Sequence, residues 1–160
     1  MEKQIRVYTR MPHPLETSPH GSSSSWILVQ EGLFEYPLAK DGKPALLANR
    51  CMNCGITFFP KRFLCPTCFE QGGMEEVKLA RRGTIYACTV IQRDSPTGIT
   101  APYAYGYVEI PANKVRVFAL LTGSDPSSFH AGQEVELVVE PIRTDSEGKQ
   151  IIGYKFKPVS

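Results

Sequence analysis

The chain of 160 residues is long enough for one ordinary domain, or for a small domain joined to a metal-held module, and its 42% hydrophobic content permits a buried core. Its 18 basic and 16 acidic residues leave a net charge of +2, which is too balanced to indicate a nucleic-acid-binding protein by itself. No apolar run is long enough for a signal peptide or a membrane span, so we expect a cytoplasmic protein with reduced cysteines.

Residues 1–27 are expected to form an extended arm. Prolines at positions 12, 14 and 19 and the serine run that follows leave no apolar period in most of this segment. Apolar residues begin at Trp26-Ile27-Leu28-Val29, which predicts a short helix or an edge strand. Trp26 is the sole tryptophan, and it is either a core residue or an anchor in a subunit interface.

Residues 28–76 are expected to form a zinc ribbon with a flanking segment. An Asp-Gly turn at 40–43 precedes an apolar strand over 45–50, which runs directly into a pair of cysteines. Phe58-Phe59-Pro60 then returns toward a second cysteine pair. Gly55 permits a tight turn after the first pair, as the two-hairpin layout of a ribbon requires.

The two cysteine pairs are the strongest chemical signal in the sequence. Each pair has two residues between its cysteines, a spacing that lets two thiolates converge on one ion. Four thiolates complete the tetrahedron that structural zinc prefers, and such a site has no open position for catalysis. We therefore predict structural zinc, with a rubredoxin-like iron site or a metal-free redox pair as alternatives. The predicted ligands are Cys51, Cys54, Cys65 and Cys68.

Residues 77–160 are expected to form a mainly β domain, because short strands alternate there with turns and no long helical period occurs. Asp125-Pro126 predicts one helical turn with Asp125 as its N-cap. Five strands with a helical turn after the third are typical of an OB-fold barrel. The expected strands are 83–93, 103–110, 114–121, 133–142 and 150–157.

No catalytic residues are predicted, since the sequence contains no GxSxG or HExxH motif and no phosphate-binding glycine loop. We expect His130 to be an exposed loop residue. The tyrosines at positions 103, 105 and 107 recur at strand spacing and share one face, which is either a packing row or a surface that stacks bases.

A modest positive bias lies on and just after the ribbon. Residues 50–82 carry six basic side chains against three acidic ones, whereas the rest of the chain is nearly balanced. The surplus either serves solubility or contacts a phosphate-bearing ligand or an acidic partner.

Seven short motifs occur in order along residues 28–158. They are Arg50-Cys51-Met52-Asn53-Cys54-Gly55, Phe59-Pro60, Cys65-Pro66-Thr67-Cys68, Arg82-Gly83-Thr84-Ile85-Tyr86, Ala101-Pro102-Tyr103, Leu121-Thr122-Gly123 and Gly132-Gln133-Glu134-Val135. In this order the motifs resemble the DUF35 family of rubredoxin-like zinc ribbons fused to OB folds. The arm is not covered by this resemblance.

The resemblance implies a role that the residues alone do not predict. Family members are accessory subunits of thiolase-like enzymes, including the benzoylsuccinyl-CoA type of aromatic degradation, and sometimes of acyl-CoA hydratases. Such a subunit has no catalytic residues of its own; it covers the CoA channel and stabilises a hetero-oligomer. On this basis we expect CoA phosphates or the partner near Lys61, Arg62, Arg81 and Arg82. A nucleic-acid-binding ribbon and OB module, or an iron electron carrier, are the alternatives.

Overall fold

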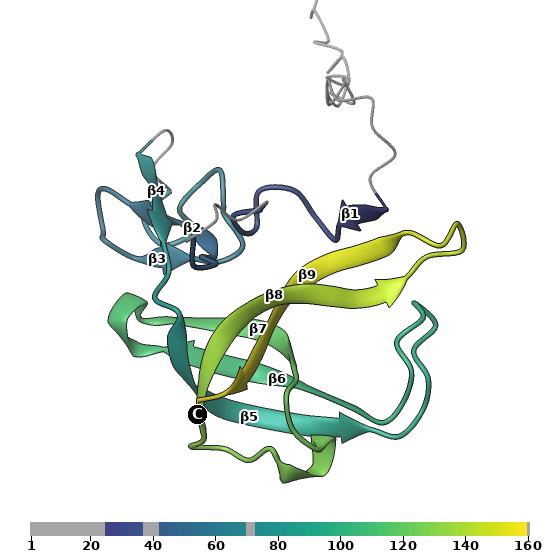
Figure 1. Ribbon diagram of the computed structural model, residues 1–160. Coiled ribbons are helices and arrows are strands. Elements are labelled where there is room, and N and C mark those ends of the chain that lie inside the picture. The colour runs from purple at the N-terminus through teal and green to yellow at the C-terminus, as the bar shows by residue number, and fades with distance from the viewer. Residues whose placement is uncertain (1–24, 37–41, 70–72, 160) are drawn as a thin grey trace, which may run out of the picture.

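The computed structural model describes residues 25–36, 42–69 and 73–159, which form two β-sheets (Figure 1). The smaller sheet contains β2 (Leu47–Cys51), β3 (Thr57–Phe58) and β4 (Met74–Lys78). The larger contains β1 (Trp26–Leu28), β5 (Arg82–Ile91), β6 (Tyr103–Ile110), β7 (Val115–Leu121), β8 (Glu134–Thr144) and β9 (Gln150–Pro158). Most of the predicted arm, and part of the predicted turn at 40–43, lie outside these ranges.

Five strands of the larger sheet close into a barrel. The strand order is β9-β7-β6-β5-β8, and a further pairing of β8 with β9 completes the ring. A short 3₁₀ turn, η2 (Pro126–Ser128), follows the third barrel strand, and the Asp125 side chain accepts a hydrogen bond from the Ser127 N–H at its start. The predicted mainly β fold with a five-stranded OB barrel is therefore confirmed, as is the predicted cap.

Side chains along β6 point alternately into the barrel core and toward its outer surface. Ala104, Val108 and Ile110 are buried, whereas Tyr107 between them is half exposed. These inward residues belong to one hydrophobic cluster to which every other barrel strand contributes, with Ile85, Val117, Leu137 and Phe156 among its members.

The ribbon sheet stands on this barrel and shares its core. Leu46 and Ala48 are fully buried members of the same cluster, and the Leu79 N–H donates to the Leu46 carbonyl at 2.9 Å. Figure 1 shows β2, β3 and β4 grouped together above the barrel. The predicted domain boundary at residue 77 lies within β4, and it stays a prediction.

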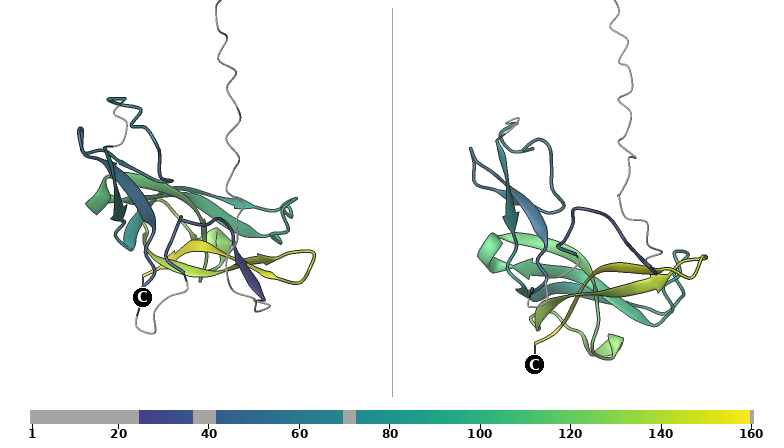
Figure 2. Two further views of the ribbon diagram at one scale, coloured as in Figure 1. Left: turned by 90° about the horizontal axis from the view of Figure 1, so that it is seen from above. Right: turned by 45° about the horizontal axis from the view of Figure 1, so that its top comes forward.

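β1 is an edge strand, one of the two forms predicted for its segment. It pairs in parallel with the start of β9. Figure 2 shows the purple N-terminal segment near the yellow C-terminal strands. The Trp26 ring packs edge-on against Tyr36 with ring centroids 4.7 Å apart, and it lies against the hydrophobic cluster. The described residues contain no helix that is long and apolar enough to cross a membrane.

Gly106 on β6 is expected to be essential for the barrel. A Cβ at this position would lie 2.1 Å from the Ala87 carbonyl oxygen and 2.8 Å from the Cys88 Cα, which are backbone atoms of β5. Gly106→Ala should therefore lower the free energy of unfolding by about 3 kcal/mol, measured by urea denaturation.

Gly148→Ala is the control for the Gly106 experiment. Gly148 has φ +80°, but no atom lies within 4 Å of a Cβ built there. The free energy of unfolding of this variant should therefore fall by only about 1 kcal/mol, which is the cost of a left-handed backbone at a residue with a side chain. Equal losses in the two variants would show that close approach to β5 does not explain the glycine.

Candidate functional site

The four predicted metal ligands come together at the end of the ribbon. Their sulfur atoms all lie within 4.8 Å of one another, and the pairs Cys51–Cys68 and Cys54–Cys65 are each 3.5 Å apart. Sulfurs bound to a zinc ion at about 2.3 Å form a tetrahedron with edges of about 3.8 Å. The donor set and its spacing therefore fit a structural four-thiolate metal site.

Two matching backbone turns present these cysteines. In the first, the Gly55 N–H donates to the Cys51 carbonyl at 2.8 Å; in the second, the Phe69 N–H donates to the Cys65 carbonyl at 2.8 Å. Gly55 has φ +74° and Phe69 has φ +56°, so both turns end in the left-handed region. Glycine accepts this region freely, whereas phenylalanine enters it at a cost of about 1 kcal/mol. The sequence therefore signals the first turn but not the second.

Backbone N–H groups in these turns favour thiolates at the two buried cysteines. The Cys54 N–H is the main cause that lowers the pKa of Cys51. Burial raises the pKa of Cys65, but the N–H groups of Cys68 and Thr67 oppose it and bring the value down to about 6. A metal ion binds thiolates, so these N–H groups prepare two of the four ligands.

Cys54 behaves differently from the two buried cysteines. The Ile56 N–H lowers its pKa, but burial and the neighbouring thiol of Cys65 raise the pKa to about 12. Its proton would be displaced by the metal ion itself.

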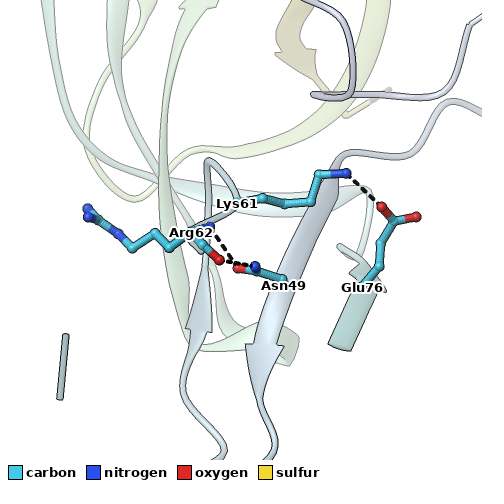
Figure 3. Close-up of polar contacts among 4 residues, drawn as sticks. All are labelled: Asn49, Lys61, Arg62 and Glu76. Atoms are coloured by element: carbon cyan, nitrogen blue, oxygen red, sulfur yellow. Dashed lines mark hydrogen bonds and ion pairs between the residues drawn. The ribbon is translucent and has the colours of Figure 1, made fainter. Parts of the chain in front are cut away.

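Lys61 and Arg62, two of the basic residues predicted near a ligand, point in opposite directions (Figure 3). The Lys61 ammonium lies 2.6 Å from a Glu76 carboxylate oxygen. The Arg62 guanidinium lies over the Phe58 ring, 5.8 Å from its centroid. Asn49 fixes this loop, because its amide donates to the Arg62 carbonyl at 2.6 Å and accepts from the Arg62 N–H at 3.1 Å.

Arg81 and Arg82, the other two predicted residues, lie where the chain enters the barrel. The Arg81 Nε is buried without a hydrogen-bond partner among the described residues. Arg82 is exposed at the start of β5, where it lines a cavity of about 180 Å³ together with Glu134. The contact of these four cations with a ligand stays a prediction.

Large apolar side chains of the ribbon are exposed beside the cysteines. Phe63 and Phe69 are 84% and 72% exposed, and Met52 is also exposed. No pattern in so short a segment distinguishes a core phenylalanine from a surface one, so the sequence does not predict the exposure of Phe63.

An aromatic face, consisting of Tyr86, Tyr103, Tyr105, Tyr107 and Phe118, covers the outside of β5, β6 and β7. Tyr107 and Phe118 lie opposite each other on adjacent strands with ring centroids 5.3 Å apart, and both are about half exposed. Tyr105 contacts Phe118 at 5.1 Å. The tyrosine row is therefore outside the barrel, which leaves interface packing and base stacking as its possible uses.

Known proteins with similar sequences point to one family. The profile of a family described as "ChsH2, C-terminal OB-fold domain" matches residues 76–140. A relative named "Benzoylsuccinyl-CoA thiolase subunit BbsA", from Thauera aromatica, is 39% identical over 120 residues, which are 74% of this chain and 81% of the relative. A "DUF35 domain-containing scaffold protein" from Methanothermobacter thermautotrophicus is 38% identical over 117 residues, which are 71% of this chain and 86% of the relative.

A solved structure has the same fold. It is titled "Ltp2-ChsH2(DUF35) aldolase", and it matches with a TM-score of 0.59 and 24% identity over 71% of this chain and 84% of that chain. The barrel of this chain agrees with the OB-fold domain that the family description names. The chain belongs to the DUF35 family.

Proposed function

We propose that this chain is a non-catalytic accessory subunit of an acyl-CoA thiolase complex, in which it stabilises the assembly and covers the CoA-binding channel. The observation that carries the proposal is the 39% identity to a thiolase subunit, over 81% of that subunit's length. Relatives named scaffold proteins support a structural role. Two relatives carry benzoylsuccinyl-CoA in their names, and for this reason we propose a complex that acts in aromatic degradation rather than a hydratase.

In this proposal Cys51, Cys54, Cys65 and Cys68 hold a structural zinc ion. All four donors come from the protein, so the ion would keep its coordination sphere filled and supply folding energy rather than catalysis. The thiolase chemistry then belongs to the partner subunit.

The exposed apolar side chains support a role in assembly. Phe63 and Phe69 are 84% and 72% exposed, so their rings gain little from burial among the described residues. Aromatic residues are also enriched at the centres of protein interfaces. We propose that the ribbon phenylalanines contact the catalytic subunit.

Nucleic-acid binding is the second candidate, and the aromatic face is the observation in its favour. The cation at that face is already engaged, because Arg116 stacks over Tyr86 at 3.6 Å and lies 3.5 Å from a Glu109 carboxylate oxygen. Phosphate contacts normally supply most of the affinity for single strands, so the face better suits a protein. Salt-dependent binding of single-stranded DNA would favour this candidate over the first.

Loss of one cysteine is expected to release the metal and unfold the ribbon. Cys54→Ser and Cys68→Ser each leave three sulfurs, and the small sheet has few buried side chains of its own. Metal analysis and amide NMR spectra check this, with Cys88→Ser in the barrel as the control. Full metal content and intact assembly in both ribbon variants would contradict the structural role. A red colour of the purified protein would show that the site holds ferric iron and not zinc.

Co-expression with a thiolase encoded beside this chain is expected to give a complex that elutes as one species. Thiolase activity should require both chains, because the partner alone lacks a cover over its CoA channel. Size-exclusion chromatography and an acyl-CoA thiolysis assay measure the two effects. Full activity of the partner alone, together with separate elution, would overturn the proposal. Co-elution with an acyl-CoA hydratase and not with the thiolase would show that the partner is a hydratase.

Substitution of the exposed ribbon phenylalanines should weaken the complex at least tenfold in Kd while the chain stays folded. Phe63→Ser removes an 84% exposed ring, and Phe69→Asn keeps a residue that tolerates positive φ. Tyr107→Ser on the aromatic face is the comparison, measured in the same binding assay. A loss confined to Tyr107→Ser would assign docking to the barrel and not to the ribbon.

A further inference from the structure

A polar cavity lies where the ribbon sheet meets the turn between β6 and β7. Its volume is about 210 Å³, and its lining includes Arg50, Thr57 and Val77 of the ribbon with Asn113 and Lys114 of the turn. Figures 1 and 2 show this turn, which contains η1 (Pro111–Asn113), next to the ribbon strands. Two cationic residues line the cavity, and the described residues contribute no acidic side chain to its lining.

Arg50 is held along the first cysteine turn. Its Nε donates to the Gly55 carbonyl at 3.1 Å, and a Cβ on Gly55 would lie 3.4 Å from Arg50 Nη2. Because this bond uses Nε, the terminal guanidinium nitrogens keep their N–H groups for a ligand. Among the described residues, Arg50 forms no ion pair.

Lys114 reaches the cavity from the barrel side. It has φ +52°, and its N–H donates to the Pro111 carbonyl at 3.2 Å. Asn113 accepts a hydrogen bond of 2.7 Å from the Ala80 N–H, which ties the turn to the segment between β4 and β5. The ribbon and the barrel therefore hold Arg50 and Lys114 on two sides of one space.

The chemistry of the cavity suits a phosphate group. Guanidinium and ammonium groups are the usual partners of phosphate oxygens, and the Thr57 hydroxyl adds another donor to the lining. Sites for whole small molecules usually measure roughly 300–1,000 Å³, so about 210 Å³ accommodates one such group and not an entire nucleotide.

We infer that the cavity between Arg50 and Lys114 binds a phosphate group. The assignment of that group to acyl-CoA rests on the proposed function. The inference that the cavity binds a phosphate does not depend on that function. Arg50 and Lys114 are not among the four cations predicted near CoA from the sequence, so this contact with the ligand differs from the predicted one.

The test uses the full chain with its metal and follows amide NMR shifts during titration with inorganic phosphate, adenosine 3′,5′-bisphosphate and CoA. Binding should shift the amides of Gly55 and Lys114 together, since they lie on opposite sides of the cavity. Tighter binding of CoA than of inorganic phosphate would support the acyl-CoA assignment. Equal affinities would refute that assignment and leave a general phosphate site.

Lys114→Asn provides the decisive variant. Asparagine tolerates the positive φ of this position, so the turn should stay folded while the cavity loses a charge. Affinity for CoA should fall at least tenfold. Lys149→Asn makes the same change in the exposed turn between β8 and β9 and should leave the affinity unchanged.

Equal binding by both variants, or amide shifts away from the cavity, would overturn the inference. The proposed function has a separate readout, because co-elution with a thiolase does not require this cavity. A chain that joins the complex but ignores phosphate would contradict the inference alone.

Discussion

The convergence of four sulfur atoms is the constraint on which the ribbon depends. Its three strands contain five, two and five residues, too few to enclose a core, and Cys51 and Cys65 are themselves among its fully buried side chains. A metal ion can supply apparent folding energy on the order of 10 kcal/mol to such a module. Arg50 directly precedes one ligand, and Phe69 directly follows another. The positions of Arg50, proposed to contact phosphate, and of Phe69, proposed to contact the partner, therefore both depend on the geometry of the cysteine cluster.

The other end of the ribbon is fixed by a different force. Leu46, Ala48 and Leu79 belong to the barrel's hydrophobic cluster, and they hold the base of the ribbon against the barrel by burial of apolar surface. The Asn113 bond to Ala80 then sets the turn of the barrel beside the ribbon. One wall of the cavity between them follows the first cysteine turn, and hydrophobic packing positions the other.

The sequence predicts strands and cysteine geometry well because both are local patterns. The expected strand 103–110 has the bounds of β6, since its residues alternate and turn residues lie on both sides. Side-chain direction is not a local pattern. Lys61 and Arg62 are adjacent in sequence but point apart, whereas Arg50 and Lys114 are distant and line one cavity. The direction of the basic side chains is therefore the part that the sequence alone could not predict.

Phe69 combines a strained backbone with an exposed aromatic ring. It occupies the same place in the second cysteine turn that Gly55 occupies in the first, and both have positive φ. A glycine there would fold with less strain, so phenylalanine lowers the stability of the turn by about 1 kcal/mol. Its ring gains little from burial in this chain, because it is 72% exposed. A strained backbone that presents an apolar ring to the outside is consistent with a residue whose burial comes from another subunit.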